Sequence, residues 1–516
     1  MGVTDLDDGI FIHTFKDYNE DLRNLATSFV RSVYGGASDP FYRPVPMDIG
    51  MLIYQFSNHG QNMAIFHIAS VMYHLISVVL LYNLFKKLQI KELHVFILCL
   101  VFAVHPAISQ AVAWIPAMNE TVLAIFSFSF FICSINYADT GKIKHLALSA
   151  LFLLLAFFTK ETAVFDAPVA FVMIVFVLQK NWLGKQNLTL YSLWVICFFV
   201  WYIARLFALG KTASLPSHVF NDMAHRLPLI VQYIGKILLP FNLSVFPSQE
   251  DTVYYYGFIG IAIIAASVFF YKQSNLRLVF SGLGIFLLFM LPVLMIPRII
   301  TEQTYEHRIY LPMIGILMIL PQTTLFQNKL REKQLLMWCI AVAGLLAIIN
   351  FRHQKSFTDP LSFWTNAVET SPHSSYANMM LAARTGDEEQ SKQLFLTAYA
   401  LNPKERYLNY IYGVMLQNKD SILASEKYFL AEKNNTGYYG CDFYLARVAM
   451  QKNDLKTAIT YLEDFLKKEP QSPLANNNLL MLYIDTGQPE KAKARIKQLQ
   501  QSGIHVPTEA LKELGM

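Results

Sequence analysis

Charge is scarce in this sequence. Charged residues make up 15% of the 516 residues, whereas hydrophobic residues make up 54%. A soluble globular protein carries about 25% charged residues, so this composition excludes an ordinary soluble protein and indicates a surface that faces lipid over much of its area. The formal net charge is only +5 and is spread over short loops, which argues against a nucleic-acid-binding surface.

Cysteine is also scarce, and its pattern excludes two further classes of protein. The chain has five cysteines, and no CxxC or mixed His/Cys spacing joins them. Neither a disulfide framework nor a zinc site is therefore expected. Four of them lie inside apolar runs, where they act as small hydrophobic residues, and the fifth is alone near the C-terminus: Cys99, Cys133, Cys197, Cys339 and Cys441.

Apolar runs dominate residues 63–351. Several are shorter than the roughly 20 residues that a helix needs to cross hydrocarbon, so we expect them to recruit flanking residues. A further apolar piece, 227–240, contains two prolines and is expected to be re-entrant or interfacial. The fold class predicted is all-α, a polytopic membrane bundle followed by a soluble helical repeat. The ten expected spans are 63–85, 93–104, 119–137, 146–158, 164–179, 190–209, 254–271, 278–297, 308–325 and 335–350.

Basic residues occupy every second loop between these spans. By the positive-inside rule, the basic loops face the cytoplasm. The first loop (1–62), the other alternate loops and everything after residue 350 then face the periplasm or lumen. The sequence thus predicts a multi-pass inner-membrane protein with its first loop and C-terminal domain outside. The basic residues are Lys86, Lys87, Lys91, Lys142, Lys144, Lys180, Lys185, Lys272, Arg277, Lys329, Arg331 and Lys333.

Residues 1–62 are too polar to span and contain two amphipathic stretches, 18–33 and 45–57. With an even number of spans and the C-terminus outside, residue 1 must also be outside. A leading apolar segment that would carry this loop across the membrane is missing. We expect a first transmembrane helix to have been lost through a misplaced start or truncation; the alternative is that a short tail flips across after insertion.

The segment 357–516 has a different rhythm, with helical stretches of about 12–14 residues separated by short turns, as in tetratricopeptide repeats (TPR). Small residues mark close helix contacts and prolines mark helix ends. A degenerate first unit is expected from Phe363 to Pro372. The alternative is an irregular helical bundle. The recurring markers are Gly386-Asp387, Ala398, Asn402-Pro403, Asn453-Asp454, Ala458, Glu469-Pro470 and Gly487 to Ala492.

Polar groups interrupt the apolar runs on the predicted outer side. Lys160 and Arg308 stand at outer ends of separate spans, where orientation calls for no positive charge. Ionisable groups at a membrane boundary are costly and usually functional, and two cations there suit a lipid phosphate. Other outer-face groups have simpler explanations. The acidic pair Asp7-Asp8 is by itself explained as solvated, and Trp114 as an interfacial aromatic residue.

Taken in order, these motifs resemble a known family. The chain is similar to the transmembrane-and-TPR glycosyltransferases of the GT-C superfold, relatives of protein O-mannosyltransferases and of bacterial lipid-donor sugar transferases. The resemblance covers almost the whole chain and depends on the order of the motifs more than on any one of them. That order is Asp7-Asp8, Tyr42-Arg43-Pro44, FAVHP at 102–106 with VAW at 112–114, Thr159-Lys160-Glu161, the 306–312 motif EHRIYLP, and the repeats.

The resemblance implies an enzyme that moves a sugar from a polyprenyl-phosphate donor to an outer-face acceptor. Asp8 or Asp7 would act as the base that deprotonates the acceptor hydroxyl. Lys160 and Arg308, with His307 beside them, would neutralise the leaving lipid phosphate. The repeats would engage a protein or peptide acceptor or another partner.

The resemblance further implies that Arg43 and His105 line the donor pocket. The sequence departs from the family at Gln110, where relatives commonly show Glu; if that Glu holds a metal or a sugar, this chain does without it or uses Glu120. The family divides on whether a divalent metal is needed, and no cluster of ligands in this sequence demands one. The lipid-linked sugar is then the donor substrate.

Two other functions are weighed against this one. A non-catalytic membrane scaffold would use the bundle as an anchor and the repeats as an interaction module, and Gln110 keeps this alternative open. A transporter or lipid flippase usually places charges near the midplane and repeats its spans. Here the charges gather at the outer boundary and no repeat of spans is evident, which argues against transport.

Overall fold

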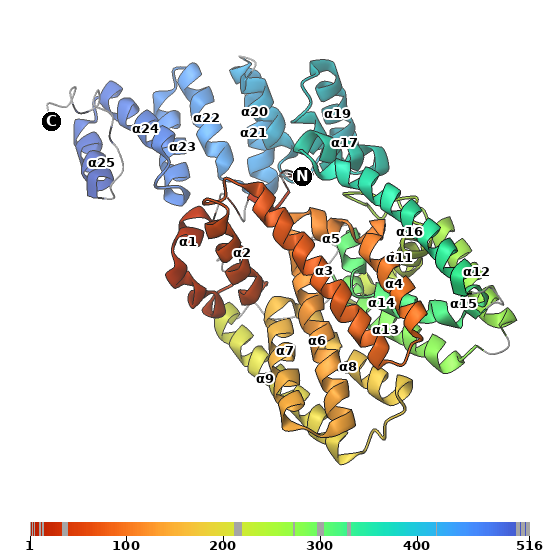
Figure 1. Cartoon of the computed structure of the whole chain (residues 1–516). Coiled ribbons are helices and arrows are strands. Elements are labelled where there is room, and N and C mark those ends of the chain that lie inside the picture. The colour runs from red at the N-terminus through yellow and green to blue at the C-terminus, as the bar shows by residue number, and fades with distance from the viewer. Residues whose placement is uncertain are drawn as a thin grey trace. The chain divides into compact units, whose positions relative to one another are not determined.

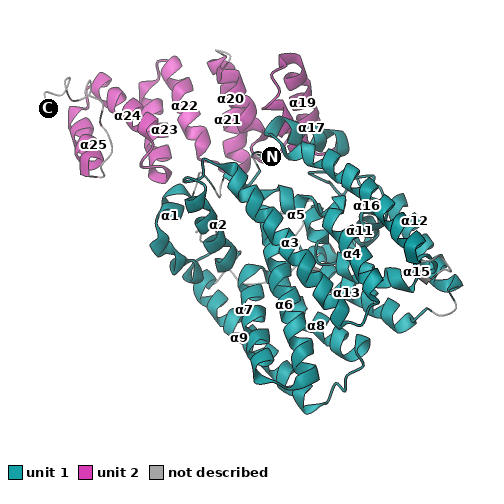
Figure 2. Ribbon diagram, in the orientation of Figure 1, with its two compact units in different colours: residues 1–371 teal, residues 372–516 magenta. Residues whose placement is uncertain are grey.

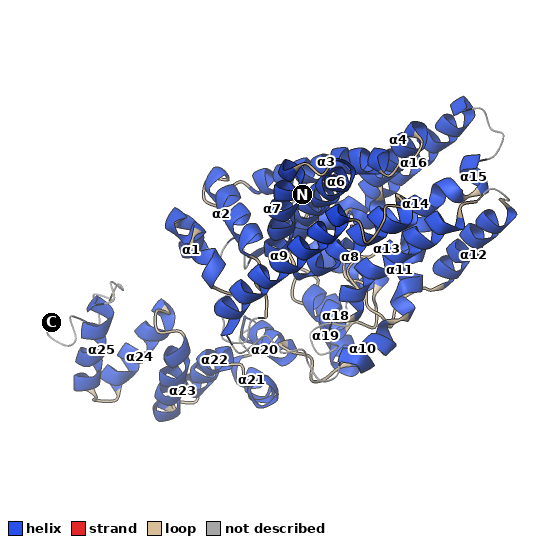
Figure 3. Ribbon diagram, turned by 90° about the horizontal axis from the view of Figure 1, so that it is seen from below, coloured by secondary structure: helices blue, strands red, loops and turns tan. Residues whose placement is uncertain are grey.

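The structure is a computed structural model of the 516-residue chain. Contacts divide the chain into two units, residues 1–371 and residues 372–516 (Figure 2). The described part contains helices and loops and no strand (Figure 3), so the prediction of an all-α chain is confirmed. The structure describes every residue except 1, 3, 5, 10–11, 13–14, 34–39, 211–218, 272–273, 297–303, 328–331, 419–420, 502–505, 507–510 and 512–516, and gives only the backbone of 219–221 and 327.

A helix occupies each of the ten segments predicted to span a membrane (Figure 1). The basic residues Lys272, Lys329 and Arg331, used to predict the orientation, lie outside the described residues. The helices are α3 (Met63–Lys87), α4 (Glu92–Val104), α6 (Met118–Thr140), α7 (Ile143–Thr159), α8 (Asp166–Phe171) with the π-helical turn Val172–Val177, α9 (Lys185–Leu209), α12 (Tyr255–Phe270), α13 (Leu276–Leu294), α14 (Met313–Ile319) and α16 (Glu332–Gln354).

By length and composition, five helical stretches among the described residues could cross a membrane: Met63–Lys87, Ile115–Thr140, Lys185–Leu209, Leu276–Leu294 and Glu332–Phe357. A sixth is formed if Glu92–Val104 and Pro106–Ala113, which meet at 53°, count as one span. Shorter apolar helices cover Ile143–Thr159, Tyr255–Phe270 and Met313–Gln322. The structure thus supports several membrane helices, while the number of spans and the side that each end faces stay predictions.

Helix α6 lies at the centre of the bundle, where α3 and α7 pack against it (Figure 1). Its most apolar window is 72% buried, whereas the corresponding windows of α9 and α16 are 22% buried. A helix that is apolar on all sides but exposed suits contact with lipid. The central helix and the peripheral helices therefore have similar hydropathy but different neighbours.

Glycines set the closest helix contacts. In α11 (Pro228–Leu238), Gly235 lies against Gly257 of α12, and a Cβ added to Gly257 would overlap the Val231 carbonyl oxygen. Gly282 of α13 and Gly315 of α14 meet in the same way, because a Cβ added to either one would overlap the carbonyl oxygen of the other. These pairs let backbones approach as small residues do in membrane helix packing.

Short irregular elements interrupt the helices where α4 and α7 end and α6 begins. They include η4 (Pro106–Ile108), α5 (Gln110–Ala113), η5 (Ile115–Ala117), η6 (Glu161–Phe165) and η9 (Glu306–Ile309). The first loop supplies α1 (Lys16–Glu20), η2 (Leu22–Leu25), η3 (Thr27–Val30) and α2 (Pro44–Phe56), in the two stretches predicted to be amphipathic. We call this end of the helices the Lys160 end, and the opposite end, where α3 ends and α4 begins, the Lys91 end.

Residues 372–516 form consecutive antiparallel helix pairs, as expected for TPR units. The predicted contact residues Ala398, Ala458 and Ala492 are fully buried. The helices are α18 (Ser375–Ala382), α19 (Glu388–Leu401), α20 (Leu408–Asn418), α21 (Ile422–Thr436), α22 (Gly440–Gln451), α23 (Leu455–Lys468), α24 (Pro473–Asp485) and α25 (Pro489–Gln501).

One hydrogen bond recurs in this unit. The side-chain amides of Asn378, Asn409 and Asn476 each donate to the carbonyl of a proline six residues earlier, at 2.9, 3.4 and 3.0 Å. The equivalent position in α22 holds Asp442, which cannot donate and instead pairs with Lys433 at 2.6 Å. The same asparagine-to-carbonyl hydrogen bond in several helix pairs indicates that one structural unit is repeated.

The predicted start of the repeat domain, residue 357, differs from the division in the structure. Helix α17 (Pro360–Thr370) belongs to the first unit, because the ring of Trp364 is fully buried 5.3 Å from that of Phe246. The Ser371 hydroxyl donates to the Phe246 carbonyl oxygen at 2.9 Å. The segment expected to be a degenerate first repeat thus packs with the helical bundle, and the second unit begins at Pro372.

Candidate functional site

Lys160 stands where α7 ends. The Lys160 backbone is extended, with φ −160° and ψ 143°, so the helix ends at Thr159 and a 3₁₀ turn begins at Glu161. The Lys160 side chain is 14% exposed and forms an ion pair with the carboxylate of Glu120, in the first turn of α6. The TKE sequence therefore turns a buried cation toward a carboxylate on the central helix.

Arg43 lies just before α2 and binds the other acidic residue of this region. Its Nε and Nη2 atoms donate to Oε2 of Glu161 at 3.0 and 2.8 Å. The backbone N–H of Tyr42 donates to Oε1 of the same carboxylate at 3.4 Å. Because Glu161 directly follows Lys160, the first loop is tied to the end of α7 beside the Lys160–Glu120 pair.

The Glu306–Ile309 turn brings His307 and Arg308 to the same place. His307 Nε2 lies 4.0 Å from Oε1 of Glu120, and its ring stacks on that of Tyr305 with centroids 5.4 Å apart. The Arg308 guanidinium carbon lies 5.4 Å from the centre of the Tyr305 ring. Four separate segments, around residues 43, 120, 160 and 307, thus contribute to one cluster.

Glu306 anchors this turn in the protein interior. The carboxylate is fully buried and binds Lys236 Nζ of α11 at 2.5 Å and the backbone N–H of Ser244 at 2.8 Å. Its second oxygen lies 3.3 Å from Nε2 of His353 in α16. A buried charge of this kind requires partners on several sides, so α11 and α16 fix the segment that carries His307 and Arg308.

The electrostatics of the cluster follow from burial among like charges. Burial lowers the pKa of Lys160, Arg43 and Arg308 lower it further, and Glu120 opposes them. Burial also holds the pKa of His307 well below its usual value, and Lys160, Arg308 and Arg43 add to the effect. Burial would raise the pKa of Glu161, but Arg43 keeps it below the ordinary value. With His307 neutral, Arg43, Lys160 and Arg308 are the positive charges that the structure places around this histidine, and such a grouping favours the binding of an anion.

His105 lies at the same end but has protein partners on both ring nitrogens. Nδ1 accepts from the Ala107 N–H at 3.2 Å, and Nε2 donates to the Ile237 carbonyl oxygen at 2.9 Å. These bonds tie the FAVHP turn to α11. The structure therefore gives His105 a tethering role, and its contribution to a donor pocket stays a prediction.

Asp7 and Asp8 lie in the N-terminal segment. Asp8 is 1% exposed, and its Oδ2 accepts from the backbone N–H and the hydroxyl of Thr4 at 2.7 and 2.5 Å. Burial raises the pKa of Asp7. The carboxylates that we find paired with the cations of the cluster are instead Glu120 and Glu161. The role of the aspartates as a base stays a prediction.

Three features of this region were missed by sequence reasoning. Glu161 belongs to the TKE motif, and the sequence did not predict that it is a site residue that joins Arg43 to the cluster. Lys236 is a single charge inside the apolar piece 227–240. The sequence could have predicted that it is paired, because an isolated charge in an apolar helix needs a partner. Gln110 was noted only as a departure, and yet its amide contacts His307.

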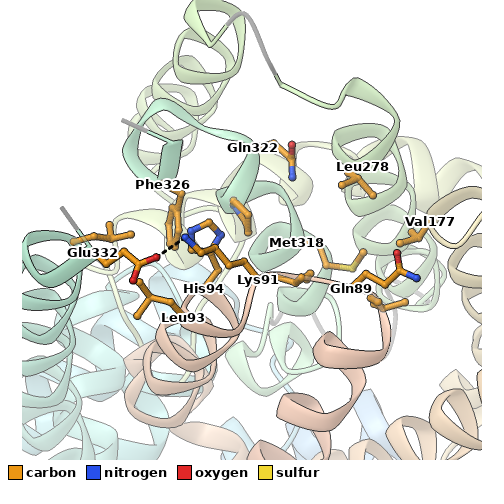
Figure 4. Close-up of a pocket in the computed structure, with 14 residues that line it drawn as sticks. Gln89, Lys91, Leu93, His94, Val177, Leu278, Met318, Gln322, Phe326 and Glu332 are labelled. Carbon is orange, nitrogen blue, oxygen red and sulfur yellow. Dashed lines mark hydrogen bonds and ion pairs between the residues drawn. The ribbon is translucent and has the colours of Figure 1, made fainter. Parts of the chain in front are cut away.

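A pocket of about 350 Å³ lies at the Lys91 end (Figure 4). It is lined by Gln89, Lys91 and His94 among others, and Lys91 forms an ion pair with Glu332 at 2.7 Å. Those two side chains are 58% and 70% exposed. The pocket thus combines apolar walls with a solvated ion pair and lacks the buried charges of the Lys160 end.

The described residues contain no group of three or more His, Cys, Asp or Glu side chains arranged to hold a metal ion. Comparison with known proteins identifies a tetratricopeptide repeat in residues 449–503, which cover the end of α22 through α25. None of the curated proteins matches the chain. The repeat is therefore shown for the C-terminal unit, and the resemblance of the membrane bundle to glycosyltransferases remains a proposal.

Proposed function

We propose that this protein is a membrane glycosyltransferase that moves a sugar from a polyprenyl-phosphate donor to an acceptor outside the cytoplasm. One observation carries the proposal. Arg43, Lys160, His307 and Arg308, which come from three distant parts of the sequence, gather around two carboxylates at one end of apolar helices. Such a cluster at a membrane boundary is expected to have a function because its burial is costly.

The chemistry of the cluster suits a lipid phosphate. When a sugar leaves a phosphate, negative charge develops on the leaving group, and fixed cations stabilise that charge. Lys160 is largely desolvated, and an ion pair in such surroundings is stronger than one in water. The side chains of Lys160 and Arg308 would therefore bind the phosphate of the donor and stabilise it as it departs.

The acceptor hydroxyl must also lose its proton as it attacks the sugar. We propose Asp8, or its neighbour Asp7, as the general base of an inverting transfer. The raised pKa of Asp7 is in the direction that favours proton acceptance near neutral pH. The tetratricopeptide repeats would bind a protein or peptide acceptor, or another partner, on the periplasmic side.

Donor binding tests the proposal. We expect Lys160→Ala and Arg308→Ala each to weaken binding of a polyprenyl-phosphate hexose by about ten- to a hundredfold, the value of a charge-assisted contact. Lys180→Ala is a matched control, because Lys180 also pairs with a carboxylate, Asp139 at 2.7 Å, but at the Lys91 end. Unchanged binding in both cluster variants, with correct membrane insertion, would remove these residues from the site.

A membrane-anchored scaffold is the second candidate, and the tetratricopeptide match favours it because such repeats usually bind other proteins. The two functions differ in one outcome. If the parent protein transfers sugar from none of several polyprenyl-phosphate donors, the scaffold becomes the better explanation. Capture of a partner by the repeats alone would not separate the two.

A further inference from the structure

Gln110, the position where the chain departs from the pattern it resembles, is fully buried beside the cluster. Its Nε2 donates to the Val245 carbonyl oxygen at 2.8 Å, and its Oε1 accepts from the backbone N–H of His307 at 3.1 Å. A carbonyl oxygen can only accept and a backbone N–H can only donate. These two bonds therefore fix the orientation of the Gln110 amide.

The fixed amide determines the tautomer of His307. Gln110 Oε1 also lies 3.1 Å from His307 Nδ1. Because Oε1 has no hydrogen, Nδ1 must carry the hydrogen of that bond. A neutral imidazole has one N–H, and burial among Lys160, Arg308 and Arg43 keeps His307 neutral by lowering its pKa. Nε2 is then left with a lone pair.

A neighbour of this ring has an unsatisfied hydrogen-bond donor. Nε2 lies 4.0 Å from Glu120 Oε1, and both atoms are acceptors. The Trp114 ring, 5.4 Å from the His307 ring, is 6% exposed, and its Nε1–H has no hydrogen-bond partner among the described residues. Buried polar groups are normally satisfied, so the unsatisfied Trp114 N–H, on a ring 5.4 Å from one whose Nε2 can accept, indicates a ligand that accepts from the first and donates to the second.

We infer that Gln110 is a positioning residue that holds His307 as the Nδ1–H tautomer, so that His307 Nε2 and Trp114 Nε1 bind hydroxyl groups of the donor sugar. A hydroxyl group can donate to Nε2 and accept from an indole N–H. The neighbouring aromatic rings of Trp114, Tyr305 and His307 provide the apolar walls that ligand sites usually combine with a few polar groups. This inference depends on the proposed function, because it places the sugar beside the cations that bind the phosphate.

The tautomer can be measured without any assay of activity. In solid-state ¹⁵N NMR of histidine-labelled protein in bilayers, His307 should show a protonated Nδ1 and an unprotonated Nε2, with His307→Asn identifying its signals among the 13 histidines. Gln110→Leu removes the acceptor and should abolish this preference. Gln110→Glu retains an acceptor and should preserve the Nδ1–H, and its negative charge should favour a second proton on Nε2. An Nε2–H tautomer in the parent protein would overturn the inference.

Two kinds of lipid, with and without a sugar, then test the sugar subsite. Binding of polyprenyl-phosphate mannose and glucose, each tested separately, is compared with binding of the same polyprenyl phosphate without a sugar. Gln110→Leu should weaken the better-bound sugar lipid by about two- to tenfold, the value of one hydrogen bond, and should leave the sugar-free lipid unaffected. Gln322→Leu is the control, since Gln322 accepts from the Asn275 N–H at 3.1 Å at the Lys91 end.

The outcomes separate this inference from the proposed function. Equal weakening of both lipids by Gln110→Leu, or no weakening, would overturn the sugar subsite while leaving the phosphate site intact. A parent protein that binds neither lipid would overturn the proposed function and the sugar subsite together. The tautomer is decided by NMR in either case.

Discussion

The two ends of the helices in residues 1–371 use the same charged residue types in opposite surroundings. At the Lys91 end, Lys91–Glu332 and Lys180–Asp139 have side chains that are between 38% and 70% exposed. At the Lys160 end, Lys160–Glu120 and Lys236–Glu306 have side chains that are at most 14% exposed. Exposed charges suffice to orient a membrane protein. Burying a charge costs free energy, so the buried charges at the Lys160 end are expected to have a structural or catalytic role.

The ion pairs at the two ends are also expected to contribute differently to the free energy of unfolding. An exposed ion pair contributes about 0–1 kcal/mol to the free energy of unfolding. Removing one member of a buried pair costs about 3–5 kcal/mol, because the other charge is left buried without compensation. The comparison therefore predicts that equivalent substitutions will have unequal effects at the two ends.

The comparison depends first on which end lies outside the cytoplasm. A periplasmic reporter fused after residue 351 should be fully active, and one inserted in the loop 327–334 should be inactive, because the basic loops stay inside. Activity is measured in intact cells, with a cytoplasmic reporter at the same positions as the control. A repeat domain found in the cytoplasm would contradict the proposed function, since the repeats could not meet an outer-face acceptor.

The largest effect on the rate of transfer is expected at Asp8. Asp8→Asn keeps the shape of the side chain but removes the proton acceptor, so transfer should fall by about 10²- to 10⁴-fold. Donor binding, measured separately, should be retained. Asp8 also accepts hydrogen bonds from Thr4 at 2.5–2.7 Å, so its replacement could act through the local structure, and Asp7→Asn is therefore made in parallel. Transfer at the parent rate in both single variants and in the double variant would exclude the two aspartates as the base.

The next largest effect is expected on the stability of the protein, at the buried Lys236–Glu306 pair. Glu306→Gln should lower the free energy of unfolding by about 3–5 kcal/mol, because Lys236 would remain buried without its counter-ion. Unfolding is followed by circular dichroism in detergent at several temperatures. Adding Lys236→Met should recover part of the loss by removing the uncompensated charge. A double variant less stable than Glu306→Gln alone would show that the pair is not the source of the effect.

The smallest effect is expected at the Lys91 end. Glu332→Gln breaks the ion pair with Lys91 and should change the free energy of unfolding by about 0–1 kcal/mol, less at high salt. The same detergent unfolding experiment measures it, with the salt series as an internal check. A loss as large as that of Glu306→Gln would remove the energetic contrast between the two ends.

Much of the fold could be predicted, because the lengths of the apolar runs and the residues that end helices are visible in the sequence. Helices occupy the predicted apolar segments, and the segment containing Ala458 and Ala492 matches the tetratricopeptide repeat family. The boundary at Ser371 was not predictable, since α17 has the periodicity of a repeat helix. Only the burial of Trp364 beside Phe246 shows which unit it packs with.

For the candidate site, too, one part could be predicted from the sequence and another part could not. Chain order and the alternation of basic loops were enough to predict that Arg43, Lys160, His307 and Arg308 belong at one end. The sequence by itself thus determined the helices, the repeat and the end at which the charges gather, because these follow from periodicity and hydropathy along the chain. Only the tertiary structure decided the partners, Lys160 with Glu120, Arg43 with Glu161 and Gln110 with His307, because ion pairs and hydrogen bonds depend on distances of a few ångströms between segments that are far apart in sequence.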